Sequence, residues 1–474
     1  MRLRAVLLVG TGFLLALFGA LSGASFTQLA AAEAPANEKT SAAASRPNII
    51  FVMVDDFGYE CVTANGGESY QTPNIDRLAK SGMRFEYCFA QPVCTPTRAQ
   101  LMTGQYNIRN YERFGWLNPN QTTFAQLFQK AGYKTCIVGK WQLGQGFQRP
   151  TQAGFDEYRL WQLNRRPPRY ANPGHEVDGQ EVDYTNGEYG PDLEAKYALD
   201  FIERNKSNPF LLYFPLTLTH DPYQPTPDSK NWDPKAKGEA VNVAPKHFAD
   251  MVAYTDKIMG RLTAKLDSLG IRDNTLIIFT GDNGTGKKTV SQFRGKPYEG
   301  GKAKPTNTGM RVPLIVSWPA RLKAGQTTDN LVDFTDFFPT LCDAAGISIP
   351  KSLTIDGHSL YPLLTGGDYS PREWTYCWYA RDGGDNPAHV HARTQTLQLN
   401  SNGRLLDYSA NEAADPVPVD NPTAEQLAVR AKLAAAIKHY ANQRPAEVSK
   451  SATAKKWHRI KDRKAQPAAT KEEK

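Results

Sequence analysis

The strongest constraint on the fold is a set of short, nearly continuous apolar runs that alternate with helical patterns. The runs cover residues 48–54, 135–138, 210–216, 276–279 and 314–316. Such runs are typical of parallel strands that are buried on both faces of a sheet. Helical patterns lie between them at 74–80, 123–128 and 247–269. This alternation predicts an α/β fold in which helices cover both faces of a large, mixed, mostly parallel sheet.

Two other regions differ from this pattern. Residues 164–190 are rich in Arg, Pro, Tyr and Gly with little periodicity, which predicts a long surface excursion. Strand-like pieces at 375–379, 394–399 and 404–408 precede a helical pattern at 423–440. We therefore predict a main domain over 47–366 and a small C-terminal α+β subdomain over 367–445 that carries an antiparallel sheet.

The two ends of the chain are predicted to lie outside these domains. Arg2 and Arg4 precede an apolar run, and Ala30 to Ala32 supply small residues, so 1–32 is predicted to be a signal peptide cleaved near Ala32. Residues 33–46 then form a linker to an exported protein, periplasmic or extracellular. No later run is apolar enough to span a bilayer, so we expect no membrane span in the mature protein.

Most of the net positive charge of the chain comes from its last segment. Residues 446–474 contain nine Lys or Arg and four Asp or Glu, against a formal net charge of +8 for the whole chain. This segment is predicted to be a disordered basic tail. No base-reading or stacking motif accompanies it, so no specific nucleic-acid partner is expected.

Polar side chains follow several of the predicted strands at the point where each strand ends. They are Asp55 and Asp56, Lys140, His220, and Asp282 and Asn283. In open α/β sheets, ligands bind beyond the carboxyl ends of the strands. These residues are therefore predicted to form one site.

The acidic members of this set favour a hard cation. Asp55, Asp56, Asp282 and Asn283 offer only oxygen ligands, whereas zinc or copper prefers His or Cys. An amide carbonyl and variable carboxylate denticity suit the flexible shell of calcium. The prediction is one Ca²⁺ rather than Mg²⁺.

A second feature is Cys94 with Pro96 and Arg98 at the predicted start of a helix. Pro suits the first helical turn, and a helix N-terminus favours a bound anion. Arg98 lies one turn after Cys94, so a sulfur atom and a guanidinium would face the same point. Guanidinium groups bind the oxygens of such anions bidentately.

The pattern Cys94-x-Pro96-x-Arg98, continued by Leu101-Met102-Thr103-Gly104, resembles the signature of the type I, formylglycine-dependent sulfatases of the alkaline phosphatase superfamily. The resemblance runs from about Pro47 to Leu364. It implies an alkaline-phosphatase-like fold and a secreted enzyme, a sulfuric ester hydrolase. It also implies that a formylglycine-generating enzyme converts Cys94 to formylglycine, and that Asp55, Asp56, Cys94, Asp282 and Asn283 bind Ca²⁺.

The resemblance assigns the catalytic cations as well. Arg98 comes from the signature, Lys140 from Gly139-Lys140-Trp141, and His220 stands shortly before Pro222. Lys302 lies eleven residues before Pro313, the spacing of the family's late lysine, although Lys296 and Lys304 are rivals. The implied reaction is attack on sulfur by a hydroxyl of the hydrated aldehyde, with Lys302 or His220 protonating the leaving oxygen.

The chain departs from the family pattern at two points. The usual His of Gly-Lys-Trp-His is Gln142 here, and an amide does not accept a proton at ordinary pH. Residues 306–309 replace a Tyr-Glu-Gly-Gly tetrad, which instead occurs at 298–301. The first departure affects breakdown of the sulfated intermediate, and the second affects the choice of lysine.

The substrate is predicted to be a sulfated small molecule or carbohydrate. Candidate substrate-binding residues are Gln142, Arg165, Arg166, Arg169 and His175. The four basic residues belong to the excursion at 164–190 and are expected to contact a further sulfate or carboxylate, with a solvated basic loop as the alternative. Two other functions remain open: a phosphonate or phosphate-ester hydrolase with the same site, and a catalytically impaired glycan-binding relative.

Overall fold

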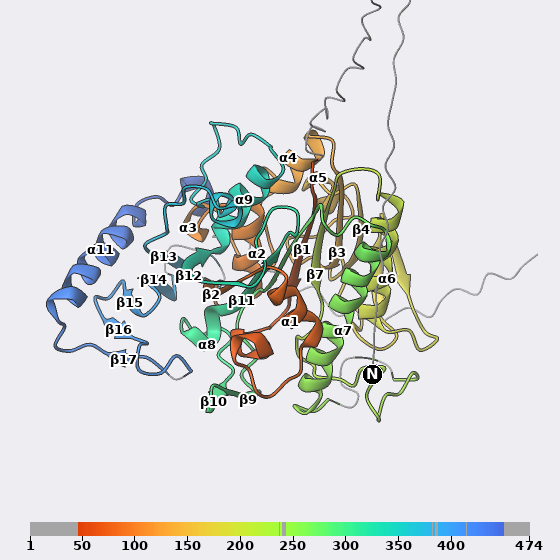
Figure 1. Cartoon of the computed structure of the whole chain (residues 1–474), viewed down its shortest axis with the longest axis horizontal. Helices are drawn as coiled ribbons and strands as arrows, with labels where there is room; N and C mark the ends of the chain where they lie inside the picture. The colour runs from red at the N-terminus through yellow and green to blue at the C-terminus, as the bar shows by residue number, and fades with distance from the viewer. Residues whose placement is uncertain are drawn as a thin grey trace, which may run out of the picture. The chain divides into compact units, whose positions relative to one another are not determined.

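The computed structural model describes residues 46–449 except 237, 239–242, 382, 384–386 and 414 (Figure 1). The predicted signal peptide and nearly all of the linker and the basic tail lie outside these residues. Within the described part of the chain, no helix combines the length and hydropathy needed to cross a membrane.

A ten-stranded mixed sheet forms the centre of the protein, in the order β12-β2-β11-β8-β1-β7-β3-β4-β5-β6. The neighbours β8, β1, β7, β3 and β4 are parallel, whereas β11 is antiparallel to both β8 and β2. The strands are β1 Asn48–Val54, β2 Met83–Phe89, β3 Lys134–Lys140, β4 Glu157–Trp161, β5 Gly174–Val177, β6 Gln180–Asp183, β7 Phe210–Leu216, β8 Thr275–Gly281, β11 Arg311–Ser317 and β12 Gln326–Asp333.

The predicted α/β fold is confirmed, and each of the five apolar runs is a strand of this sheet. Strand β1 shows why its run is continuous. Ile49, Phe51 and Met53 pack into one core, and the alternate residues Ile50, Val52 and Val54 pack into another on the opposite face. Because both faces are covered, every residue from Ile49 to Val54 is apolar.

The helices cover the two faces of the sheet in separate groups. Residues of α2, α4 and α9 contribute to one core and residues of α1, α6 and α7 to the other, as the side chains of each cluster show. The helices are α1 Pro73–Lys80, α2 Cys94–Thr103, α3 Asn107–Asn110, α4 Phe124–Lys130, α5 Arg149–Gln152, α6 Gly190–Arg204, α7 His247–Ser268, α8 Asn307–Met310, α9 Phe337–Ala344, α10 Tyr361–Thr365 and α11 Ala424–Tyr440, with short 3-10 turns at Tyr59–Cys61, Thr63–Asn65 and Phe334–Asp336.

A second, five-stranded antiparallel sheet follows in the C-terminal part, in the order β13-β14-β15-β16-β17. Its strands are β13 Thr375–Tyr379, β14 His389–Arg393, β15 Leu397–Asn400, β16 Leu405–Asp407 and β17 Val417–Pro418. Side chains of α11 pack with this sheet and with Tyr106 and Tyr111 around α3. The predicted antiparallel subdomain is confirmed, although its domain boundaries stay a prediction.

The region 164–190 is not a structureless excursion, and this prediction was wrong. Strands β5 and β6 form a hairpin that extends the main sheet beyond β4, and α6 begins at Gly190. The hairpin strands have four residues each, and β6 is a largely exposed edge strand. Short polar strands at a sheet edge carry little apolar periodicity, which is why the pattern missed them.

Candidate active site

Carboxylates gather where β1 and β8 end. Asp55 and Asp56 directly follow β1, Asp282 and Asn283 directly follow β8, and the two strands are parallel neighbours that pair Val54 with Gly281. The backbone N–H of Asp56 donates to Asp282 Oδ1 at 3.1 Å, and Asn283 Nδ2 donates to Asp56 Oδ1 at 2.8 Å. All four side chains are buried. The strand-end argument therefore placed these residues together correctly.

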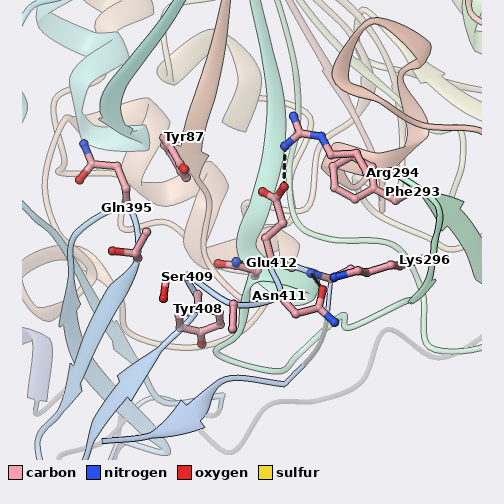
Figure 2. Close-up of a pocket in the computed structure, with 13 residues that line it drawn as sticks. Tyr87, Phe293, Arg294, Lys296, Gln395, Tyr408, Ser409, Asn411 and Glu412 are labelled. Atoms are coloured by element: carbon pink, nitrogen blue, oxygen red, sulfur yellow. Dashed lines mark hydrogen bonds and ion pairs between the residues drawn. The ribbon is translucent and has the colours of Figure 1, made fainter.

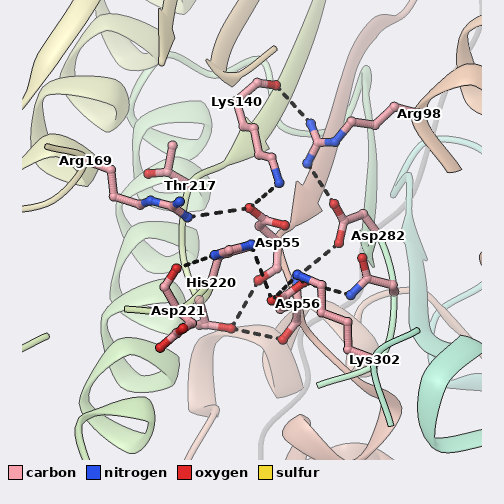
Figure 3. Close-up of polar contacts among 12 residues, drawn as sticks. Asp55, Asp56, Arg98, Lys140, Arg169, Thr217, His220, Asp221, Asp282 and Lys302 are labelled. Carbon is pink, nitrogen blue, oxygen red and sulfur yellow. Dashed lines mark hydrogen bonds and ion pairs between the residues drawn. The ribbon is translucent and has the colours of Figure 1, made fainter. Parts of the chain in front are cut away.

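A cationic side chain contacts each of the three carboxylates, as Figure 3 shows. Lys140, the last residue of β3, donates from Nζ to Asp55 Oδ2 at 2.7 Å. Arg98 of α2 donates to Asp282 Oδ2 at 2.8 Å and to the Lys140 carbonyl at 2.9 Å. Lys302 contacts the Asp56 carboxylate at 2.6 Å. Each carboxylate thus has its own cation.

The contacts separate Lys302 from its two rivals in the sequence. The side chain of Lys304 is 42% exposed, and its Nζ lies 3.9 Å from Asp415. The Nζ of Lys302 instead lies 2.6 Å from the Asp56 carboxylate. Lys296 lines a different pocket of about 310 Å³, together with Tyr87, Phe293, Tyr408 and the ion pair of Arg294 with Glu412 (Figure 2). Lys302 is therefore the late lysine that joins the cluster.

Cys94 is the first residue of α2 and is 2% exposed. Potential ligand atoms of Cys94, Asp55 and Asp282 lie within 4.8 Å of one another. Burial and the charge of Asp282 raise the pKa of the Cys94 thiol, with Lys140 opposing them. The thiol is therefore protonated at neutral pH, and a protonated thiol is a weak nucleophile.

His220 lies in the loop after β7, with Nε2 3.8 Å from Asp56 Oδ2. Burial, together with the positive charges of Lys302 and Arg169, lowers the pKa of His220 to about 3. The ring is therefore neutral at pH 7. Lys302 differs, because Asp56 outweighs the effect of burial and raises its pKa, so it keeps its proton.

The oxygen set fits a hard cation. Asp55 Oδ1 and Asn283 Oδ1 are buried and have no hydrogen-bond partner among the described residues. Lys140 and other cations outweigh burial and lower the pKa of Asp55, whereas burial and Asp55 raise the pKa of Asp282 to about 7. A divalent ion would be coordinated by these two oxygens, and its charge would favour the ionised form of Asp282. Asp55, Asp56, Asp282 and Asn283 are thus able to hold Ca²⁺.

The predicted substrate-binding residues lie in different environments. Arg165 is buried in ion pairs with Asp183 at 2.5 Å, Glu176 at 3.4 Å and Glu181 at 3.5 Å. His175 is fully buried, 3.5 Å from Glu194. Both residues therefore make structural contacts around β5, and a substrate contact for either stays a prediction.

The other three lie closer to the carboxylate cluster or to solvent. Arg169 Nη1 is 4.0 Å from Asp55 Oδ2. Arg166 is exposed over the Trp161 ring, 6.0 Å from its centroid. Gln142 is 7% exposed, and its Oε1 has no hydrogen-bond partner within the described part of the chain.

Left-handed backbone marks the loops of this site. Asp56, Gln142 and Ala303 have φ of +59°, +54° and +71°. Non-glycine residues in this conformation cost of order 1 kcal/mol each and concentrate at functional sites. The sequence did not predict this feature, nor did it predict the roles of Trp161 and Tyr170, whose rings contact the guanidinium of Arg169. The aromatic residues next to a basic stretch were the available signal.

Comparisons with known proteins found family models, sequence relatives and solved structures that resemble this chain. A family model described as Sulfatase matches residues 47–347, and one described as N-sulphoglucosamine sulphohydrolase, C-terminal, matches 305–406. The chain is 30% identical over 374 residues to N-acetylgalactosamine-6-sulfatase of Mus musculus, covering 70% of this chain and 68% of the relative.

Two solved structures extend the likeness. Ps i-CgsB in complex with k-i-k-neocarrahexaose matches with a TM-score of 0.71 and 25% identity, over 85% of this chain and 94% of that one. The phosphonate monoester hydrolase of Agrobacterium radiobacter matches with a TM-score of 0.62 and 19% identity, over 84% and 96%. The latter likeness concerns the fold alone.

Proposed function

Because the chain belongs to the sulfatase family and is therefore a sulfuric ester hydrolase, we propose that it hydrolyses sulfate esters of carbohydrates at the site around Cys94. One observation carries this proposal: three buried carboxylates alternate with three buried or half-buried cations beside Cys94. Such a cluster can hold a metal ion on its oxygen side and an anion on its cationic side. The relatives that act on or bind sugars support the carbohydrate part.

The proposed cofactors are one Ca²⁺ and a formylglycine at position 94. When present, they supply a hydrated aldehyde as the oxygen nucleophile and a positive charge near it. The orphaned oxygens of Asp55 and Asn283 support the ion. The chemistry of position 94 supports the modification. The Cys94 thiol is protonated and so a weak nucleophile, and a sulfated thiol would have no neighbouring hydroxyl that could release the sulfate.

Arg98 and Lys140 are proposed to bind the sulfate oxygens. Arg98 is held on two sides, by Asp282 and by the Lys140 carbonyl, so its guanidinium is oriented before substrate arrives. Preorganised donors stabilise charge that develops in the transition state without reorganising. This is the role that a fully buried arginine beside Cys94 can serve.

Lys302 is proposed to protonate the leaving oxygen. It carries its proton at neutral pH, whereas the lowered pKa of His220 leaves that ring neutral. His220 would then accept a hydrogen bond or a proton in the second step, when sulfate is expelled. Gln142 occupies the position of the family's histidine and would contribute a hydrogen bond only.

We also propose that the protein is exported after cleavage near Ala32 and is matured by a formylglycine-generating enzyme. Residues 47–366 would form the catalytic domain and 367–445 the C-terminal subdomain. The exposed Arg166 would contact a further anionic group of a carbohydrate substrate.

A paired substrate panel tests the function. Protein produced together with the modifying enzyme should cleave an aryl sulfate and release sulfate from sulfated oligosaccharides, and should act weakly on the matching aryl phosphonate. A clear preference for the phosphonate would replace the proposal by the alternative, a phosphonate or phosphate-ester hydrolase with the same site. The fold likeness to a phosphonate monoester hydrolase is the reason to include that arm.

A further inference from the structure

Arg169 lies in the carboxylate cluster and not on the outer surface of its loop. It is 1% exposed, and its Nη1 lies 4.0 Å from Asp55 Oδ2. The same oxygen accepts the hydrogen bond from Lys140 at 2.7 Å. Figure 3 shows both cations directed at Asp55 from different elements. Arg169 is therefore a neighbour of the residues that surround Cys94.

The sheet places Arg169 beside Lys140. Lys140 and Trp161 are register partners at the ends of the parallel strands β3 and β4. The Arg169 guanidinium lies over the Trp161 ring, 4.0 Å from its centroid. A cation over an indole face is attracted by the ring quadrupole. Trp161 thus supports the guanidinium next to the end of β3.

The backbone around Arg169 is held as well. Trp161 Nε1 donates to the Pro167 carbonyl at 3.0 Å. The Tyr170 hydroxyl donates to the carbonyl of His220 at 2.6 Å, which ties this loop to the loop of the predicted catalytic histidine. Gly190 packs so closely that a Cβ there would lie 2.0 Å from the Arg169 carbonyl oxygen. Arg169 is therefore a fixed cation.

Arg169 adds a further cation to the cluster, directed at the same oxygen of Asp55 as Lys140. Arginine binds oxyanions through two short parallel bonds. Among the described residues the cluster contains three carboxylates and four cations when Arg169 is included. A divalent ion would add to this positive excess. The arrangement suits a tetrahedral oxyanion in contact with Arg169.

We infer that Arg169 binds an oxygen of the sulfate group that is cleaved, alongside Arg98 and Lys140. This inference deepens the proposed function and depends on it. It also revises the sequence prediction, in which Arg169 contacts a further sulfate or carboxylate of the substrate. The family's histidine is absent at position 142, and Arg169 supplies a charged donor that the amide of Gln142 cannot supply.

The test uses an aryl sulfate with no other anionic group, so that only the reacting sulfate is available. Arg169→Gln should lower kcat/KM on this substrate, and weaken binding of inorganic sulfate in calorimetry, by about 10- to 100-fold, the range for hydrogen bonds to charged groups. Arg169→Lys, which keeps the charge and loses the bidentate grip, should lie between wild type and Arg169→Gln. It also serves if Arg169→Gln fails to fold.

Arg444→Gln is the matched control, because Arg444 also lies over an indole ring, 4.4 Å from the Trp378 centroid, on the C-terminal subdomain. It should leave sulfate affinity and aryl sulfate kinetics unchanged. Calcium affinity and melting temperature are measured for all variants, because a purely structural role of Arg169 would change stability without changing sulfate affinity.

The outcomes separate the two proposals. An unchanged aryl sulfate reaction together with a loss on sulfated oligosaccharides alone would overturn the inference in favour of a distant contact. Unchanged sulfate affinity in both Arg169 variants would overturn it as well. Failure of the wild-type protein to cleave any sulfate ester would instead count against the proposed function, and the calorimetric comparison with inorganic sulfate would still test Arg169.

Discussion

Removal of the Lys302 amine should slow the reaction in a manner that depends on the leaving group. Lys302 contacts Asp56 at 2.6 Å, and that carboxylate raises its pKa, so the amine enters the reaction protonated. General acid catalysis is worth about 10²- to 10⁴-fold, which corresponds to about 3 to 5 kcal/mol of transition-state stabilisation. Lys302→Ala should therefore lower kcat/KM by that factor for alkyl and sugar sulfates, whose leaving oxygens need the proton.

The same variant should lose far less on 4-nitrophenyl sulfate, because a stable phenolate departs without a proton. The assay is kcat/KM across a series of sulfate esters that differ only in the basicity of the leaving group. Lys304→Ala is the control, since Lys304 is 42% exposed and pairs with Asp415. Equal losses across the series would refute the role of Lys302 as the acid and would leave it as a binding residue. A large effect of Lys304→Ala would show that the other lysine acts.

Four further predictions concern the metal and the second half of the reaction. Asp282→Ala should abolish Ca²⁺ binding in calorimetry together with activity. In the wild type, the pKa of Asp282 is raised, so its ionisation destabilises the metal-free protein as pH rises from about 4 to 7. Bound Ca²⁺ should therefore raise the melting temperature more above about pH 7 than near pH 5. A Ca²⁺-induced shift in melting temperature that is independent of pH would contradict this. Gln142→His should shrink the burst of phenol seen in rapid-quench kinetics, because base assistance worth about 10²- to 10⁴-fold would speed release of sulfate; no burst in the wild type would mean that this step is not limiting. Cys94→Ser should be sulfated once without turnover, detected as a stable mass increase, and sustained turnover would exclude the need for an aldehyde.

The carboxylate cluster was predictable because parallel strands end at the same edge of a sheet. Continuous apolar runs located β1 and β8, and the residues that follow them had to meet. The choice among Lys296, Lys302 and Lys304 was not predictable in this way. Lys296 begins the short strand β10 (Lys296–Glu299), and Lys302 and Lys304 follow shortly after it. Only the tertiary contact with Asp56 separates Lys302 from the others.

Arg169 illustrates a different limit. Its local sequence is basic and proline-rich, which is the composition of an exposed loop. Its burial depends on Trp161 at the end of β4 and on Tyr170, whose hydroxyl bonds the carbonyl of His220 fifty residues later in the chain. Contacts between residues so distant in sequence leave no trace in periodicity or composition, so the burial of Arg169 escaped prediction.

The central claim is that Cys94 acts as formylglycine, and a peptide mass measurement tests it most directly. Trypsin cleavage after Arg84 and Arg98 releases residues 85–98, which contain Cys94 and also Cys88 as an internal reference thiol. In an active preparation we predict that the –CH₂SH of Cys94 is replaced by –CHO, that the peptide reacts with a hydrazide, and that alkylation labels Cys88 alone. An active preparation in which both positions are alkylated and no hydrazone forms would contradict the claim.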